Sequence, residues 1–213
     1  MIKQLTPNIP DYELLDTGDG EKLERFGRHV VRRPEPQAIW RKSLGEREWL
    51  RADASFLRDV KSEERGEWKL KPEMPSRWMV GFNHRDMHLR MRLALTSFKH
   101  VGIFPEQAAN WEFIYDTIED LKQSGIERPK VLNLFAYTGG ATLAARSAGA
   151  DTTHVDSVKQ VVTWARENME SSGLDGVRWI VEDAMKFVER EVRRGNKYHG
   201  IILDPPAYGR GAN

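Results

Sequence analysis

The sequence contains no cysteine among its 213 residues. Disulfide bridges, thiolate metal sites and cysteine nucleophiles are therefore excluded within it. It has no run approaching the roughly 18 apolar residues of a membrane-spanning helix. Its start, MIKQLTPNIPDYE, lacks the apolar centre of a signal peptide. We therefore expect a cytoplasmic protein that binds neither a membrane nor a metal ion.

A large net charge is also absent, since the formal charge is only +1, but the positive side chains are unevenly distributed. Residues 25–42 hold six arginines and lysines against one acid, and residues 82–100 form a second basic stretch. Basic segments with interleaved aromatic residues contact the phosphates of nucleic acids, although many charged runs are only solvated surface. Both interpretations stay open here; on the first, Arg32 and Arg33 contact RNA phosphates.

Short strand-like pieces fill the first part of the chain, which predicts a small β-rich domain over residues 1–75. The pieces are YELLDTGDGEKLERFG and HVVRRPEPQAIWRK, and turn signals break them at TGDGE and at two prolines. Tryptophans are usually large buried anchors, so we assign those of this region to the core and to interfaces. They are Trp40, Trp49, Trp68 and Trp78.

Helices and strands alternate in the second expected domain, residues 76–213. An amphipathic helix between Pro105 and Gly125 comes first. Four strands follow, the apolar KVLNLFAY and then DTTHVD, VRWIVED and HGIILD, with a helical segment between each strand and the next. This alternation is typical of an α/β fold with parallel strands and right-handed crossovers. Because the chain stops just after the fourth strand, we expect the carboxyl-terminal part of the sheet to be missing.

Acidic residues end three of the four strands: Asp156 the second, Asp183 the third and Asp204 the fourth. In open parallel sheets, ligands bind outside the carboxyl ends of the strands. Asp156 lies 17 residues after Gly139, near the spacing at which an acid accepts hydrogen bonds from ribose hydroxyls. Such acids also serve as simple helix caps, but three of them together favour a ligand.

The first turn, FAYTGG, indicates which nucleoside binds. It lacks the G-x-G-x-x-G pattern that brings backbone amides close to a diphosphate. A nucleoside without a diphosphate, such as S-adenosylmethionine, therefore fits better. In that case Asp183 accepts a hydrogen bond from the adenine amine, and Val158 and Ala184 pack against the adenine ring.

Three segments in order, VLNLFAYTGGATLAARSAGA, HVDSVKQVVTWARENMESSGL and DPPAYGRG, resemble class I S-adenosylmethionine-dependent methyltransferases. Within that class the chain is similar to the branch that methylates large-subunit ribosomal RNA. The resemblance covers about residue 100 to the end and implies a Rossmann-like sheet, S-adenosylmethionine as cofactor and RNA as partner. GIFPEQAANW resembles the segment that closes over the cofactor. The implied cofactor-binding residues are Gln107, Phe135, Ala136, Tyr137, Thr138, Gly139, Asp156, Ser157, Asp183 and Ala184.

The DPPAY stretch supplies the candidate catalytic residues, which are Asp204, Pro205, Pro206 and Tyr208. Prolines have a fixed φ and no amide donor, so they form a stiff rim of hydrogen-bond acceptors. A base edge that donates hydrogen bonds would bind there. Tyr208 would stack on a base removed from its helix, and Arg210 would hold a phosphate.

Several alternatives stay open. An exocyclic amine and carbon 5 of a pyrimidine are both candidate target atoms, and the second needs a cysteine that would have to lie in the missing carboxyl-terminal part. The methyl acceptor is alternatively a protein or a small molecule. A non-catalytic module that binds a nucleoside or RNA is the third interpretation. The oligomeric state is also open, with a homodimer as one candidate.

Overall fold

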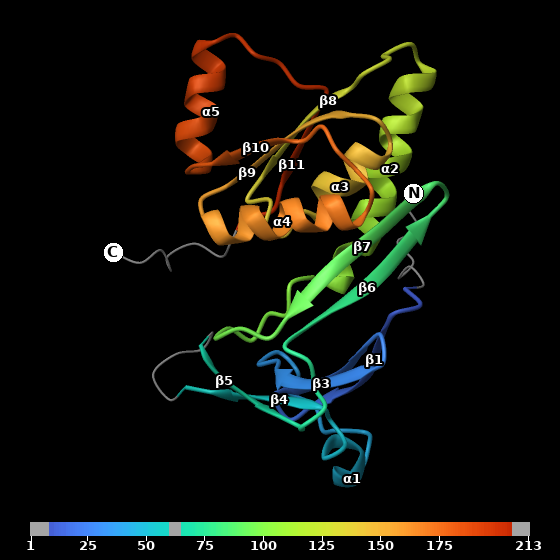
Figure 1. Cartoon of the computed structure of the whole chain (residues 1–213), viewed down its shortest axis with the longest axis vertical. Coiled ribbons are helices and arrows are strands. Elements are labelled where there is room, and N and C mark those ends of the chain that lie inside the picture. Colours follow the sequence, from blue (N-terminus) through green and yellow to red (C-terminus); the bar gives the residue numbers. More distant parts are fainter. Residues whose placement is uncertain (1–8, 60–64, 206–213) are drawn as a thin grey trace. The chain divides into compact units, whose positions relative to one another are not determined.

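The structure is a computed structural model that describes residues 9–59 and 65–205 (Figure 1). The described chain divides into two compact units. The amino-terminal unit comprises the described residues of 8–82 and 91–105, and the carboxyl-terminal unit comprises those of 83–90 and 106–213. The division expected from the sequence, 1–75 and 76–213, stays a prediction.

A mixed sheet of five strands forms the amino-terminal unit, in the order β1-β2-β3-β4-β5. Its neighbours run antiparallel except β3 and β4, which are parallel. A short helix, α1 (Glu46–Trp49), lies in the connection from β3 to β4. The strands are β1 (Tyr12–Gly18), β2 (Glu21–Phe26), β3 (His29–Pro34), β4 (Ala54–Arg58) and β5 (Gly66–Leu70). This confirms the β-rich fold that the sequence predicts.

The core of this unit includes Leu23, Trp49 and Ala52, which are buried together. Trp49 is fully buried, as expected of an anchor. Trp40 differs, because 53% of it is exposed, although its indole nitrogen donates to the Thr17 carbonyl at 2.8 Å. Trp40 is therefore not a core anchor, and an interface role for it stays a prediction.

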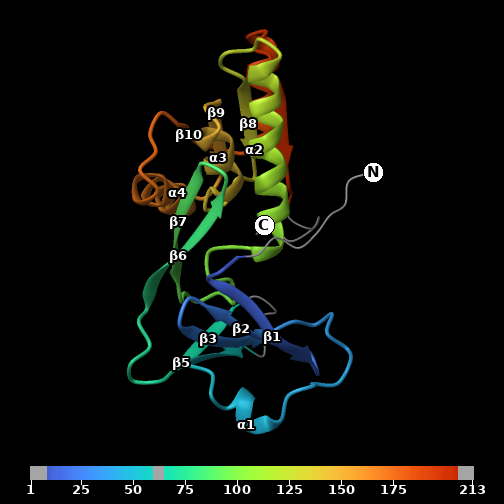
Figure 2. The same cartoon turned by 90° about the vertical axis from the view of Figure 1, so that its right-hand side faces the viewer.

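A two-stranded hairpin contains much of the second basic stretch. Its strands are β6 (Arg77–His84) and β7 (Met87–Ala94), which pair with each other (Figure 2). In β7 the apolar side chains alternate with polar ones, so that Met87, Leu89 and Met91 are buried. This period of two is the reason that a segment rich in arginine forms a strand.

Four parallel strands form the sheet of the carboxyl-terminal unit, in the order β10-β9-β8-β11. They are β8 (Lys130–Leu134), β9 (Asp151–Asp156), β10 (Arg178–Val181) and β11 (Gly200–Leu203). The helices are α2 (Ala108–Gln123), preceded by the 3-10 turn η1 (Pro105–Gln107), α3 (Gly140–Ser147), α4 (Lys159–Ser171) and α5 (Ala184–Arg193). Because the chain adds β9 and β10 on one side of β8 and then crosses to the other side for β11, the order reverses at β8. Ligands bind at such a reversal.

The two faces of this sheet are covered by different helices. Leu132 and Leu134 of β8 pack with Phe187 of α5 on one face. On the other face, Asn133 of β8 donates to Thr142 of α3 at 2.8 Å. This architecture confirms the α/β fold expected from the sequence. No helix in the described ranges 9–59 and 65–205 is long and apolar enough to cross a membrane.

Candidate active site

The turn between β8 and α3 has an unusual backbone. Phe135 and Tyr137 have φ values of 55° and 50°, in the left-handed region, and Gly139 has a φ of 93°. Left-handed conformations cost non-glycine residues roughly 1–3 kcal/mol each and persist only where the surroundings hold them. Backbone strain of this kind is concentrated at functional sites, which favours a ligand here.

Two side chains fasten this turn to the neighbouring elements. Asp156, at the end of β9, accepts from the Tyr137 amide through Oδ2 at 3.0 Å. Asn168 of α4 is fully buried and donates through Nδ2 to the Thr138 carbonyl at 2.9 Å. A Cβ atom on Gly139 would lie 3.1 Å from Ala165 Cβ, so the turn packs closely on α4. The turn is therefore held from two sides before any ligand arrives.

A buried polar network lies beneath the turn. Thr142 Oγ1 lies 2.9 Å from His154 Nδ1, and it also accepts from Asn133. Burial lowers the pKa of His154 to about 3, so its ring is neutral near pH 7 and packs against the Trp179 ring with the centroids 4.8 Å apart. Neither His154 nor Asn168 was predicted from the sequence. The histidine and two threonines in the middle of a predicted strand were the available signal for a buried polar network.

Asp156 itself is half-buried and bound on both oxygens. Besides the bond to Tyr137, its Oδ1 accepts from the amide of Val158, the N-cap residue of α4, at 2.9 Å. This bond forms a turn just before α4 and is not a helix cap, because the N-cap residue is Val158 and α4 has no side-chain capping bond. Each carboxylate oxygen has a second lone pair, so the contact to ribose remains a prediction.

Asp183 also accepts a backbone hydrogen bond at the start of a helix. It is the N-cap of α5, where its Oδ1 accepts from the Lys186 amide at 3.0 Å, and it is exposed. Ala184, next to it, is 6% exposed and belongs to the core cluster under α5. Exposed apolar side chains stand beside these acids, at the carboxyl edge of the sheet. They are Val158 at 45%, Val181 at 50% and Met185 at 65% exposed, of which the sequence analysis named only Val158.

The other predicted cofactor residues differ in what they can present. The side chains of Ala136 and Thr138 are buried, so these residues offer a ligand their backbone. Phe135 packs partly against the core cluster of the sheet. Ser157, between Asp156 and the start of α4, is exposed. Their contacts to a cofactor stay predictions.

Gln107 and Asp204 meet, although they lie 97 residues apart in the sequence. Gln107 Nε2 donates to Asp204 Oδ2 at 3.3 Å. Asn110, one turn along α2, donates through Nδ2 to Gln107 Oε1 at 2.7 Å. One predicted cofactor residue and one predicted catalytic residue therefore share a site. Pro205 is exposed beside Asp204, while Pro206, Tyr208 and Arg210 lie outside the described residues.

The upstream arginines are engaged within the amino-terminal unit. Arg33 is 3% exposed, and its guanidinium donates to the fully buried Glu24. Burial alone would raise the pKa of Glu24, but the charge of Arg33 holds it below its usual value. The expectation that Arg33 contacts RNA phosphate is therefore wrong, because its side chain is an interior ion pair.

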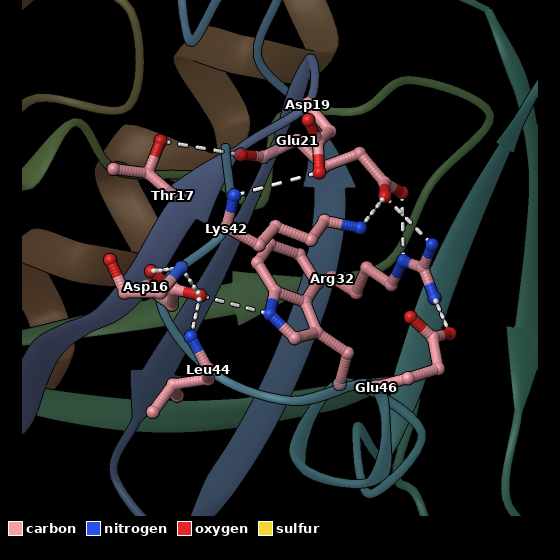
Figure 3. Close-up of polar contacts among 10 residues, drawn as sticks. Asp16, Thr17, Asp19, Glu21, Arg32, Lys42, Leu44 and Glu46 are labelled. Atoms are coloured by element: carbon pink, nitrogen blue, oxygen red, sulfur yellow. Dashed lines mark hydrogen bonds and ion pairs between the residues drawn. The ribbon is translucent and has the colours of Figure 1, made fainter. Parts of the chain in front are cut away.

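Arg32 is part of a second charged cluster (Figure 3). It donates twice to Glu21, at 2.7 Å each, and Lys42 reaches the same carboxylate at 2.6 Å. Lys42 also lies over the Trp49 ring, 4.0 Å from its centroid. The indole nitrogen of Trp49 in turn donates to the buried Asp16 at 3.0 Å. The cluster fastens the segment before α1 to the sheet, so a structural role accounts for Arg32, and its contact with phosphate stays a prediction.

In the described part of the chain, no three histidine, aspartate or glutamate side chains group as metal ligands would. The candidate site consists of hydrogen-bonding and apolar groups along the carboxyl edge of the parallel sheet.

The chain matches a protein family and resembles solved structures. The family model described as Conserved hypothetical protein 95 matches residues 94–212. A S-adenosylmethionine-dependent methyltransferase from Agrobacterium tumefaciens is 42% identical with a TM-score of 0.83, covering 94% of this chain and 61% of that chain. The structure of SMU.776 complexed with SAH is 21% identical with a TM-score of 0.67, covering 94% of this chain and 53% of that one. At this identity the similarity establishes a shared fold and no more.

A curated relative is the ribosomal RNA large subunit methyltransferase K/L of Shewanella frigidimarina. It is 31% identical over 122 residues, which are 56% of this chain and 16% of that protein. The chain thus spans a small part of this relative's length. The family match covers more than half of the chain, and the resemblance to class I methyltransferases is confirmed. The chain belongs to the Conserved hypothetical protein 95 family and has the fold of S-adenosylmethionine-dependent methyltransferases.

Proposed function

We propose that this chain is a S-adenosylmethionine-dependent methyltransferase that acts on a base of RNA, with large-subunit ribosomal RNA as the substrate. The observation that carries the proposal is the joint position of the strained turn, Asp156 and the Gln107–Asp204 pair at the carboxyl edge of one parallel sheet. The names of the relatives in Agrobacterium and Shewanella support the reaction and the substrate class.

The residues at this edge fit S-adenosylmethionine. Asp156 has lone pairs left for ribose hydroxyls, and Asp183 stands exposed where an adenine amine would donate. Val158, Val181 and Met185 expose apolar surface beside these acids, which an adenine ring would cover. When bound, S-adenosylmethionine supplies an electrophilic methyl group on its sulfonium.

The contribution of the chain is to hold the acceptor base in line with that methyl group. Asp204 is an exposed carboxylate that accepts a hydrogen bond from the base edge. Pro205 beside it offers a carbonyl acceptor and has no amide donor to compete. Pro206 and Tyr208 complete this rim in the proposal, with Tyr208 stacking on the base. Correct placement of two reactants accounts for about 7–11 kcal/mol of a barrier in favourable cases.

Calorimetry tests the cofactor. We expect binding of S-adenosylmethionine and of SAH, and we expect NAD to bind far more weakly because the turn does not suit a diphosphate. Tight binding of NAD without binding of S-adenosylmethionine would contradict the proposal.

Transfer of labelled methyl groups tests the acceptor, with large-subunit ribosomal RNA compared with protein and small nucleosides. Label in protein or in a small molecule alone would favour the other acceptor classes. Salt-dependent RNA binding without affinity for S-adenosylmethionine would favour a non-catalytic RNA-binding module. The target atom, the homodimer and the cytoplasmic location remain predictions.

A further inference from the structure

The side chain of Gln107 has an unusual task for its position. It is the N-cap residue of α2, where a side-chain oxygen normally accepts from a backbone amide of the first turn. Gln107 makes no such capping bond. Its Oε1 instead accepts from the side chain of Asn110, and its Nε2 donates to Asp204. Because Gln107 ends the 3-10 turn η1 and has helical backbone angles, its side chain is not a cap and instead joins two other side chains.

Two neighbours agree on the orientation of the Gln107 amide. Asp204 can only accept, so the NH2 end of Gln107 faces its Oδ2, at 3.3 Å. The carbonyl end then faces Asn110, whose Nδ2 donates to it at 2.7 Å. Asn110 therefore holds the amide from the α2 side in the orientation that Asp204 requires.

We propose that Asn110 is a positioning residue for methyl transfer: through the Gln107 amide it fixes the carboxylate of Asp204 that orients the acceptor base. The inference rests on the proposed function only in the role of Asp204; the three-residue chain of hydrogen bonds is independent of it. The donor at position 110 holds the carbonyl end of Gln107, and a side chain of the same shape that only accepts would repel that oxygen and displace the amide from Asp204.

Asn110→Asp is the sharpest variant, because it keeps the shape of the side chain and replaces the donor with an acceptor. A carboxylate in the first turn of a helix is favourable toward the helix dipole, so we expect α2 to be no less stable. Gln123→Glu is the matched control. It adds the same charge to α2, at an exposed position in the last turn. Asn110→Ala removes the donor without adding a repelling oxygen.

The first measurement does not depend on activity. The side-chain amide of Gln107 and the carboxyl carbon of Asp204, assigned through Asp204→Asn, are followed by NMR at one pH. We expect both signals to move in Asn110→Asp and to stay in place in Gln123→Glu. Signals that are the same in parent, Asn110→Asp and Gln123→Glu would overturn the inference, whatever the reaction of the protein proves to be.

The second measurement separates positioning from folding. In Asn110→Asp, we expect turnover at saturating S-adenosylmethionine to fall roughly 10-fold to 100-fold, with cofactor affinity and melting temperature close to those of the parent. The turnover of Asn110→Ala should fall less than that of Asn110→Asp. In a Gln107→Ala background, Asn110→Asp should have no further effect, because the coupling runs through Gln107. Equal effects with and without Gln107 would overturn the inference, whereas a parent that binds no S-adenosylmethionine would instead contradict the proposed function.

Discussion

Acidic side chains have opposite environments in the amino-terminal sheet and at the carboxyl end of β11. In the amino-terminal unit, Asp16 and Glu24 are buried and bound by several donors, among them the Trp49 indole and Arg33. Burial alone would raise the pKa of Asp16, but the Leu44 amide and the Trp49 indole hold it below its usual value. In the carboxyl-terminal unit, Asp204 is exposed at the edge of the sheet. Buried and saturated acids make a scaffold, while an exposed acid at a strand end is available to a ligand.

Breaking the interior ion pair tests the scaffold side of this comparison. Arg33→Ala leaves the Glu24 carboxylate buried without its partner, so the free energy of unfolding should fall by about 3–5 kcal/mol in urea denaturation. Because the pKa of Glu24 is lowered in the folded state, its contribution is present above pH 4.5 and is lost as the pH falls below that value.

The control for this pair is Glu13→Ala, which removes a surface ion pair and leaves the bond from Arg25 to the Gly27 carbonyl in place. Arg25 pairs with Glu13, whose side chain is 56% exposed, and such a surface pair contributes about 0–1 kcal/mol. Equal losses for the two variants would show that the Arg33 pair is not the structural element that its burial indicates.

The pH dependence of the free energy of unfolding tests the buried His154 of the carboxyl-terminal unit. His154 has a folded pKa of about 3 against an ordinary value of 6.5, so the unfolded chain binds more protons between these values. Stability should therefore fall as the pH drops below 6.5, by about 1.4 kcal/mol per pH unit from this group. His154→Gln should remove that slope, whereas His88→Gln, at an exposed histidine, should keep it.

Replacing the exposed acid should affect the reaction and spare the fold. Asp204→Ala should lower methyl transfer to RNA about 100-fold, because the acceptor base loses the group that orients it. The affinity for S-adenosylmethionine, measured by calorimetry, and the melting temperature should stay near the parental values. A variant that transfers methyl groups at the parental rate would show that the acceptor binds elsewhere.

Asp156 lies between these two extremes, since it is half-buried and holds the turn. Asp156→Ala should weaken the binding of S-adenosylmethionine by roughly 1–3 kcal/mol, because ribose loses a charged acceptor. Asp175→Ala is the control, at a side chain that is 92% exposed. If calorimetry finds the same affinity for both variants, Asp156 serves only to bind the amides of Tyr137 and Val158.

The sequence was sufficient for most of the carboxyl-terminal unit. β8 and β11 are short apolar runs, and each helix has apolar residues at helical spacing with a glycine after its end, so local pattern and tertiary structure agree there. It was less informative for β6 and β7. There the alternation of Met87, Leu89 and Met91 with polar residues was present, but the positive charge drew the interpretation toward a binding surface.

Long-range pairings could not be predicted, for a physical reason. Glu24 and Arg33 meet across β2 and β3 only in the register that the turn and the core impose, and a strand shifted by one residue would place them on opposite faces. Likewise, Gln107 and Asp204 meet because β11 crosses to the far side of β8, which brings residues 97 positions apart to one edge. Single residues indicated chemistry, while their partners depended on the fold.

The close packing of α2 on α3 has a consequence for the spacing of the site. A Cβ atom on Gly140 would lie 2.6 Å from Trp111 Cε2, so α2 approaches α3 to a distance that only a residue without a side chain permits. Gly140 begins α3 directly after the strained turn, and Gln107 lies four residues before Trp111. The absence of a Cβ atom at Gly140 therefore sets the spacing between α2 and α3. That spacing determines the distance between the strained turn and the Gln107 amide, which faces Asp204.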